Sequence, residues 1–229
     1  MKVVEVLHMN GGNGDISYAN NSLVQRKVIL MTTPIMEQAI SDLCCSLFPE
    51  TLYVADLGCS SGANTFLVVS EFVKIVEKER KKHNLQSPEF HFNFNDLPGN
   101  DFNTIFQSLG KFQQDLRKQI GEGFGSCYFS GVAAEVKYIV EKEGSFTINQ
   151  LETTRVHWNN ASNYHENNIN GGYNVSKCMR AVAEPLLLSQ FDPKFMDLVF
   201  QKYEEIISDC MAKEKTEFIN VTVSLTKKK

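Results

Sequence analysis

The sequence lacks the features of several protein classes. Its N-terminus has no long apolar stretch, which argues against a signal peptide, and no apolar run approaches the roughly 20 residues of a membrane span. Positive charge is not in excess, because 23 lysines and arginines stand against 27 aspartates and glutamates, for a net charge of −4. The chain therefore lacks the excess of positive charge that is typical of proteins that bind nucleic acid or an anionic membrane. We expect a cytoplasmic protein.

Paired cysteine and histidine spacings are also missing. The six cysteines form no CxxC pair, which indicates free thiols in a reducing compartment. The five histidines lack a metal-ligand spacing such as HExxH, so we expect no metal site. The dinucleotide fingerprint GxGxxG is absent as well, which argues against a nicotinamide-dependent oxidoreductase.

The first half of the chain predicts an α/β fold. Helices are expected at 18–31 and 36–47, divided at Pro34 because proline interrupts a helix. After them, strands at 52–57, 89–96 and 127–132 alternate with helices that follow residues 63 and 100, the first of which ends in a charged, solvated stretch at 78–84. This β-α-β-α-β order is typical of the opening of a parallel doubly wound sheet.

The second half predicts a different arrangement. Strands are expected at 146–158 and 218–225, separated by a polar loop and by helices at 175–189 and 193–212. We expect the two strands to pair antiparallel. The chain is accordingly divided into a cofactor-binding half at 1–132 and carboxyl-terminal strands and helices at 133–229, both within one domain.

A glycine turn follows the strand that ends at Asp56. Gly58 and Gly62 give the pattern DxGxxxG between a strand and a helix, where ligands can approach backbone N–H groups. It is the shape of the first motif of class I methyltransferases, although an ordinary βα turn could look the same. Asp96, at the end of the next strand, could accept hydrogen bonds from two ribose hydroxyls or could cap the following helix.

Six segments of the chain resemble the plant SABATH methyltransferases, with the closest likeness to salicylate and benzoate carboxyl methyltransferases. The resemblance covers 1–132 and 135–229, which is nearly the whole chain. The matching segments are 7–22 (LHMNGGNGDISYANNS), 56–64 (DLGCSSGAN), 95–103 (NDLPGNDFN), 172–175 (GYNV), 180–187 (RAVAEPLL) and 218–221 (FINV). The resemblance implies a class I methyltransferase sheet of Rossmann-like type with a partial helical cap.

The resemblance also implies ligands and roles for single residues. S-adenosylmethionine is the expected cofactor, and the expected substrate is a small carboxylic acid of the salicylate, benzoate or jasmonate type. Positions matching those that hold the cofactor in the family are Tyr18, Cys59, Asn64, Asp96 and Leu97. Positions matching the acceptor site are Gln25, which grips the carboxylate, and Met179, Val182 and Phe218, which line the pocket.

Two further sequence features bear on these roles. Tyr18, Ser22 and Gln25 have the spacing i, i+4, i+7, which places them on one face of the first expected helix. Asn10 stands where relatives usually carry lysine, a change that weakens one expected contact to the cofactor carboxylate.

Methyl transfer to a carboxylate requires no general base, since the acid is already ionised at neutral pH. We therefore expect no catalytic residue beyond groups that position the reactants and exclude water.

A long segment of the family is missing between Ala133 and Ala134. In relatives this segment supplies contacts to adenosine, the opposite wall of the acceptor pocket and two middle strands of the sheet, so the resemblance implies a sheet truncated in the middle. The alternative function is a non-catalytic family remnant that binds cofactor weakly or pairs with a full-length relative. Whether the chain forms a homodimer stays open.

Overall fold

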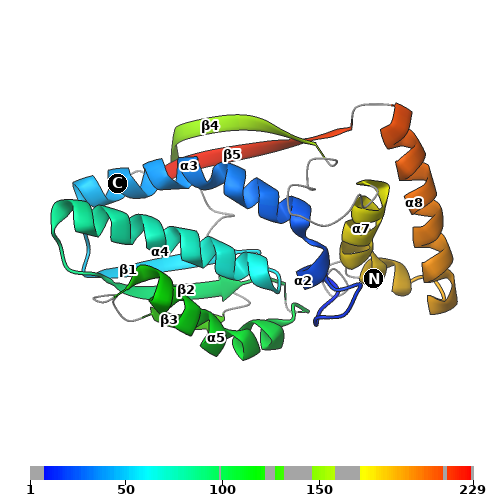
Figure 1. Cartoon of the computed structure of the whole chain (residues 1–229), viewed down its shortest axis with the longest axis horizontal. Helices are drawn as coiled ribbons and strands as arrows, with labels where there is room; N and C mark the ends of the chain where they lie inside the picture. Colours follow the sequence, from blue (N-terminus) through cyan, green and yellow to red (C-terminus); the bar gives the residue numbers. More distant parts are fainter. Residues whose placement is uncertain are drawn as a thin grey trace.

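The computed structural model describes residues 8–97, 99–121, 127–131, 146–157, 171–213 and 216–227. Two sheets of different kinds flank a layer of long helices (Figure 1). A short helix α2 (Tyr18–Asn21) leads into α3 (Leu23–Ser46), which lies between the second sheet and the helix α4 (Ala63–His83).

The first sheet is parallel and has the order β1-β2-β3, as the sequence predicts. Its strands are β1 (Thr51–Leu57), β2 (Glu89–Asn95) and β3 (Cys127–Gly131). Residues alternate between the two faces of a strand, so Phe90, Phe92 and Phe94 of β2 all point to one face, where they are almost fully buried.

That face is covered by α4 and by α5 (Phe102–Ile120). Val73 and Val76 of α4 and Ile105 of α5 have no exposed surface, and they pack against the three phenylalanines of β2. This apolar cluster is the larger of the two cores, and it fixes the carboxyl ends of β1 and β2 toward α2 (Figure 1).

The opposite face of this sheet carries a ladder of stacked rings. Tyr53, His91 and Tyr128 lie in register on the three strands, with ring centroids 4.8 Å apart at each step. Tyr53 is 74% exposed, and among the described residues β1 pairs only with β2. The sheet therefore presents an open edge at β1, as expected if middle strands are missing.

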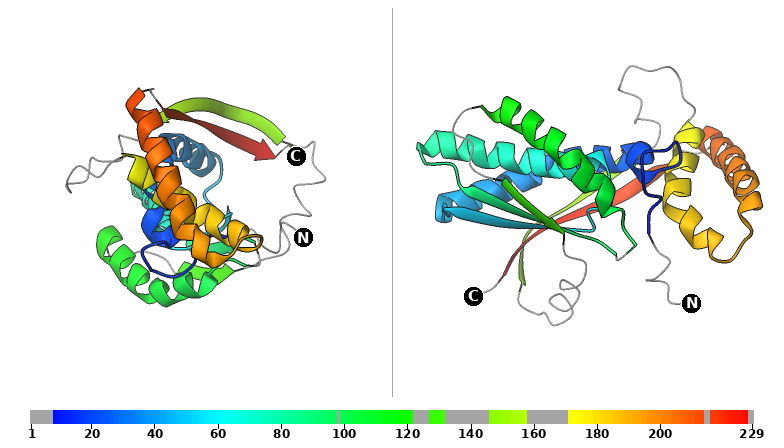
Figure 2. Two further views of the ribbon diagram at one scale, coloured as in Figure 1. Left: turned by 90° about the vertical axis from the view of Figure 1, so that its right-hand side faces the viewer. Right: turned by 90° about the horizontal axis from the view of Figure 1, so that it is seen from below.

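The second sheet consists of β4 (Phe146–His157) and β5 (Glu217–Lys227), which pair antiparallel as predicted. Between them the chain forms α7 (Gly171–Leu188), the short η2 (Pro193–Phe195) and α8 (Met196–Lys213). Figure 2 shows α7 and α8 side by side at the end of the molecule where the N-terminal loop lies. The predicted polar loop before α7 lies outside the described residues.

The predicted break at Pro34 is wrong, because α3 continues through it as one helix. Ile35, Ile40 and Cys44 beyond the proline are buried, and Ile40 and Cys44, one turn apart, lie on the helix face that joins the larger core. Burial of this face outweighs the hydrogen bond that proline removes. By length and composition alone α3 could also cross a membrane, a weak indication that core helices of other proteins share.

The chain breaks instead at Ser22, between α2 and α3. Tyr18, Ser22 and Gln25 therefore do not lie on one continuous helix, contrary to the prediction. The charged stretch from Lys78 to Asn84 belongs to α4 as far as His83, and most of its side chains are exposed as expected. Its helix carries two buried carboxylates, Glu77 and Glu79, at 2% and 4% exposure.

Candidate cofactor and acceptor site

The glycine turn between β1 and α4 needs both of its glycines. Gly58 and Gly62 have φ values of +96° and +101°, a region that residues with a side chain rarely adopt. A Cβ atom at Gly62 would also lie 2.6 Å from the Cβ of Ala19. The turn thus packs directly against α2, and the helix that bears Tyr18 is held close to the end of β1.

Asp96 ties the end of β2 to this turn. The backbone N–H of Ser60 donates to one carboxylate oxygen of Asp96 at 2.5 Å, and the N–H of Leu97 donates to the other at 2.7 Å. The helix α5 is capped by Asp101, which accepts hydrogen bonds from Thr104, so Asp96 is not the cap of that helix. Each oxygen of Asp96 keeps acceptor capacity for a further donor, such as a ribose hydroxyl.

The turn contains two buried hydroxyl groups with no hydrogen-bond partner among the described residues. They are Ser60 Oγ and Ser61 Oγ, and both side chains are more than nine-tenths buried. Leaving a buried hydroxyl unsatisfied costs about 1–3 kcal/mol. Their position beside Asp96 fits the polar groups of a bound S-adenosylmethionine, which could satisfy them, and the residues present therefore suit this cofactor.

The electrostatics around the turn are set by burial and by neighbouring carboxylates. Burial, and then the charge of Asp96, raises the pKa of Asp56 to about 6. Burial, followed by Asp56 and Asp96, raises the pKa of the Cys59 thiol to about 12. The pKa of Tyr18 is also raised to about 12, by burial and then by Cys178 and Asp96. At neutral pH the thiol and phenol are uncharged, so the carboxylates dominate and favour a cationic ligand.

Asn64 contacts the break between α2 and α3. Its amide nitrogen donates to both the carbonyl oxygen and the hydroxyl of Ser22, each at 3.0 Å. Thr65, its neighbour, donates to the Cys59 carbonyl at 2.8 Å. The first turn of α4 therefore joins the cofactor loop to the helix segment that carries Gln25.

On the predicted acceptor side, Gln25 contacts a thiol. Its amide nitrogen lies 3.2 Å from the sulfur of Cys178 on α7, and this is the same cysteine that raises the pKa of Tyr18. Tyr18 and Gln25 thus converge on Cys178 although the helix between them is broken. A cavity of about 40 Å³ beside Cys178 has room for a few water molecules, and none of the predicted acceptor residues lines it.

The other predicted pocket residues lie near this point. Met179 packs against the smaller core, which includes Val24, Val156 and Cys178, and Val182 is half-buried one turn further along α7. Phe218 pairs through its backbone with Val156 of that core, while its side chain lies outside the described structure. The structure therefore brings Gln25 and Met179 to the smaller core, while Val182 lies one turn along α7 and the backbone of Phe218 lies beside Val156.

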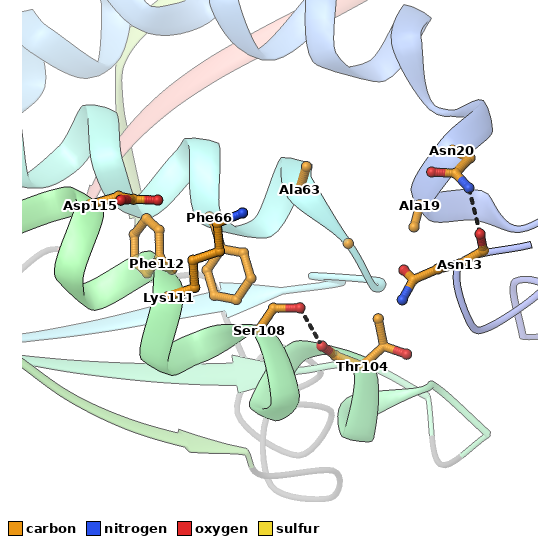
Figure 3. Close-up of a pocket in the computed structure, with 11 residues that line it drawn as sticks. Asn13, Ala19, Asn20, Ala63, Phe66, Thr104, Ser108, Lys111, Phe112 and Asp115 are labelled. Carbon is orange, nitrogen blue, oxygen red and sulfur yellow. Dashed lines mark hydrogen bonds between the residues drawn. The ribbon is translucent and has the colours of Figure 1, made fainter.

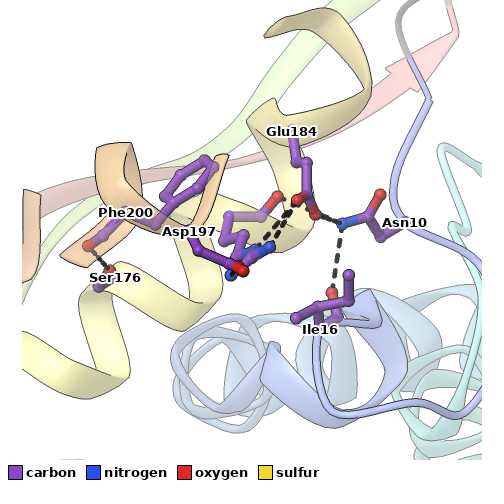
Figure 4. A network of polar contacts seen from close by, with 7 residues as sticks. Asn10, Ile16, Ser176, Glu184, Asp197 and Phe200 are labelled. Atoms are coloured by element: carbon purple, nitrogen blue, oxygen red, sulfur yellow. Dashed lines mark hydrogen bonds and ion pairs between the residues drawn. The ribbon is translucent and has the colours of Figure 1, made fainter. Parts of the chain in front are cut away.

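A polar network anchors the N-terminal loop to α7 (Figure 4). The Asn10 amide donates to Glu184 at 2.8 Å, and the backbone N–H of Asn10 donates to the Ala181 carbonyl at the same distance. Arg180 holds Glu184 with two hydrogen bonds and reaches Asp197 on α8 at 2.8 Å. Sequence reasoning missed this role of Arg180 and Glu184, although their spacing of i, i+4 on a helix was a usable signal.

The network also reaches Tyr18, because the Tyr18 N–H donates to the Asn10 carbonyl at 2.9 Å. Asn10 is therefore a structural link between α7 and the cofactor side in this chain. The residue identified as a departure from the family's usual lysine has its side chain engaged by Glu184.

A separate groove of about 340 Å³ lies between α4 and α5 (Figure 3). Phe66 and Phe112 stack there with ring centroids 4.5 Å apart, and Asn13 and Asn20 stand at its other end. None of the nine predicted site residues is among those that line this groove. No local sequence pattern indicates this groove, because its walls come from three distant segments.

Comparisons with known proteins identify a family for the chain. A family model described as SAM dependent carboxyl methyltransferase matches residues 4–134 and 122–228. The S-adenosyl-L-methionine:benzoic acid/salicylic acid carboxyl methyltransferase 2 of Petunia hybrida is 51% identical over 359 positions, with 99% of each chain covered. The salicylate carboxymethyltransferase of Clarkia breweri is 31% identical over 357 positions, covering 100% of this chain and 99% of that protein.

The alignment with the Petunia protein contains a large gap. It spans 359 positions, whereas this chain has 229 residues, so at least 359 − 229 = 130 positions have no residue of this chain. The two matches to the family model meet at 122–134, where the sequence predicts the missing segment.

Among solved structures, one described as loganic acid methyltransferase with SAH superposes with a TM-score of 0.69 at 18% identity, covering 96% of this chain and 99% of that one. This likeness supports the fold.

Proposed function

The chain belongs to the family of S-adenosylmethionine-dependent carboxyl methyltransferases, and from this premise we propose that it binds S-adenosylmethionine at the glycine turn and inherits the methylation of a benzoate- or salicylate-type acid. The observation that carries the proposal is the pair of Asp96 hydrogen bonds beside two unsatisfied buried serine hydroxyls. We further propose that this chain turns over far more slowly than intact relatives.

The proposed cofactor contacts come from residues held by separate elements. Asp96 would accept hydrogen bonds from the ribose, while Leu97 and Cys59 would contact the cofactor from the ends of β2 and β1. The neutral Tyr18 hydroxyl is available as a donor, since its raised pKa keeps it protonated. Asn64 would hold the cofactor loop in place through Ser22. When bound, the cofactor supplies an electrophilic methyl group on a sulfonium.

The proposed acceptor contacts are incomplete. Gln25 is the donor suited to a substrate carboxylate, and Met179, Val182 and Phe218 would line an aromatic ring beside it. In this structure the Gln25 amide contacts Cys178, so the donor expected to bind the substrate carboxylate is already engaged. With no opposite wall to orient the acid, alignment of the carboxylate with the methyl group is lost.

The test is calorimetric titration of the chain with S-adenosylhomocysteine. Asp96→Ala should weaken binding by about 1–3 kcal/mol, because donors at the site lose a charged acceptor. Asp209→Ala is the matched control, since Asp209 pairs only with an exposed lysine of its own helix and should leave the affinity unchanged. Equal affinities of the Asp96 variant and the parent chain would remove Asp96 from the site.

A second candidate is a non-catalytic protein that pairs with a full-length relative in the cytosol. The open edge of β1 favours it, because an edge strand with exposed Tyr53 and Leu57 offers a surface for another chain. Free thiols at all six cysteines agree with a reducing compartment. Size-exclusion chromatography of an equimolar mixture with an intact relative would separate this candidate from a chain that acts alone.

A further inference from the structure

A cluster of possible metal ligands lies at the far end of the molecule from the candidate site. Glu79 and His83 are one turn apart on α4, and Cys45 faces them from the last turn of α3. One donor atom from each of these three side chains lies within 4.8 Å of the other two. Both helices end on the side of Figure 1 opposite to α7 and α8, so the cluster is independent of the proposed function.

The burial pattern shows why the cluster needs an explanation. Glu79 is a carboxylate at 4% exposure, while Cys45 and His83 beside it are exposed. Buried carboxylates require a cation or several hydrogen bonds. Lys82 donates to Glu79 Oε2 at 3.3 Å and His83 Nε2 lies 3.5 Å from the same oxygen, and both distances exceed the usual 2.7–3.2 Å of N–H···O hydrogen bonds.

Thiolate, imidazole and carboxylate together form a donor set suited to zinc. Zinc binds all three ligand types in tetrahedral geometry with bonds of about 2.0–2.3 Å, which places donor atoms roughly 3.3–3.8 Å apart. The observed separations require only small side-chain rotations, and the exposed Lys82 can move away into solvent. We propose that Cys45, Glu79 and His83 bind a zinc ion, with water as the fourth ligand.

The surroundings of Glu79 support this assignment. The hydroxyl of Ser41, one turn before Cys45 on α3, donates to Glu79 Oε1 at 3.1 Å. This bond orients the carboxylate and leaves Oε2 on the side of His83, as a supporting hydrogen bond does at a metal site. On binding, the Cys45 thiol releases its proton to solvent. The ion would join the carboxyl ends of α3 and α4, which precede β1 and β2 respectively.

The full chain is titrated with Zn²⁺ in a calorimeter, in buffer that contains a phosphine reductant and no chelator. Its thermal unfolding is then measured with and without zinc. We expect one zinc per chain and a higher unfolding temperature with zinc present. Cys45→Ser and His83→Gln should each weaken binding about tenfold or more. Cys210→Ser is the matched control, because Cys210 is likewise exposed but lies on α8, and it should bind zinc like the parent chain.

Titration with Co²⁺ gives a second readout that does not depend on stability. The parent chain should show a thiolate-to-cobalt absorption band in the near ultraviolet, and Cys45→Ser should lose it while Cys210→Ser keeps it. Circular dichroism establishes that each variant folds. Absence of stoichiometric binding, or equal binding by Cys45→Ser and the parent chain, would overturn the proposal.

Discussion

The cofactor side and the acceptor side of the candidate site differ in whether their hydrogen-bonding groups already have partners. On the cofactor side, Asp96 is held by two backbone N–H groups, and the Ser60 and Ser61 hydroxyls have no partner in the described part of the chain. On the acceptor side, the Gln25 amide is already engaged by Cys178. Among the described residues, the first side therefore keeps polar groups free for a ligand, whereas the donor expected to bind the substrate carboxylate is occupied.

This difference follows from where each side gets its residues. The cofactor side is built mainly by the ends of β1 and β2, which lie over the larger core, and by α2, which packs against the glycine turn. In the proposed site, the acceptor side depends on α7 and on positions that the Petunia relative has and this chain lacks. The chain can therefore keep its fold and its cofactor binding even though it no longer aligns the substrate with the cofactor.

The largest effect is expected in turnover. The parent chain should transfer no measurable radiolabelled methyl to salicylate, benzoate or jasmonate, because orientation of the reactants contributes roughly 7–11 kcal/mol and depends on both walls. An intact relative assayed at the same protein concentration is the positive control. Turnover near that of the relative would mean that the missing segment is not part of the working site.

A smaller effect is expected when the cofactor turn is strained. Gly62→Ala should destabilise the chain by about 2 kcal/mol or more, because its φ is +101° and its new Cβ would meet Ala19. Gly110→Ala is the control: it lies exposed in α5 with open space around it, so it should stabilise by about 0.5–1 kcal/mol. Urea unfolding measures both, and equal stabilities of the two variants would contradict the described turn.

The smallest effect concerns pH. Since the pKa of Asp56 is raised from 3.8 to about 6, the folded chain holds this proton more tightly than the unfolded chain. The stability that this proton provides is complete below about pH 4 and is lost as the pH rises through about 6. Asp56→Asn should reduce the change in unfolding free energy between pH 4 and pH 7 by about 1–2 kcal/mol. This value is lowered because the Asp56 carboxyl is partly exposed to solvent. Unfolding curves at pH 4, 5, 6 and 7 test it, and parallel profiles for variant and parent would refute it.

Local patterns were sufficient to predict the strands. Alternation in 89–96 and the apolar run at 52–57 gave β2 and β1, and the late strands pair antiparallel as expected. The position of Asp96 at a strand end also followed from sequence. These features depend on side-chain period and on neighbours in the chain, which a sequence displays directly.

Features that depend on tertiary packing could not be predicted. Pro34 lies inside a helix because buried residues beyond it hold the helix together, and Glu79 is buried because α3 covers a charged stretch of α4. The contact of Gln25 with Cys178 joins residues 153 positions apart. No local sequence pattern predicts such a contact, although the contact determines whether the Gln25 amide is free to bind a substrate.

Calorimetry with both ligands tests the contrast between the two sides most directly. The parent chain is titrated with S-adenosylhomocysteine, and the resulting complex is then titrated with salicylate. We predict binding of one S-adenosylhomocysteine per chain and no measurable heat from salicylate. Salicylate that binds the complex as it binds an intact relative, or a chain that fails to bind S-adenosylhomocysteine, would contradict the account.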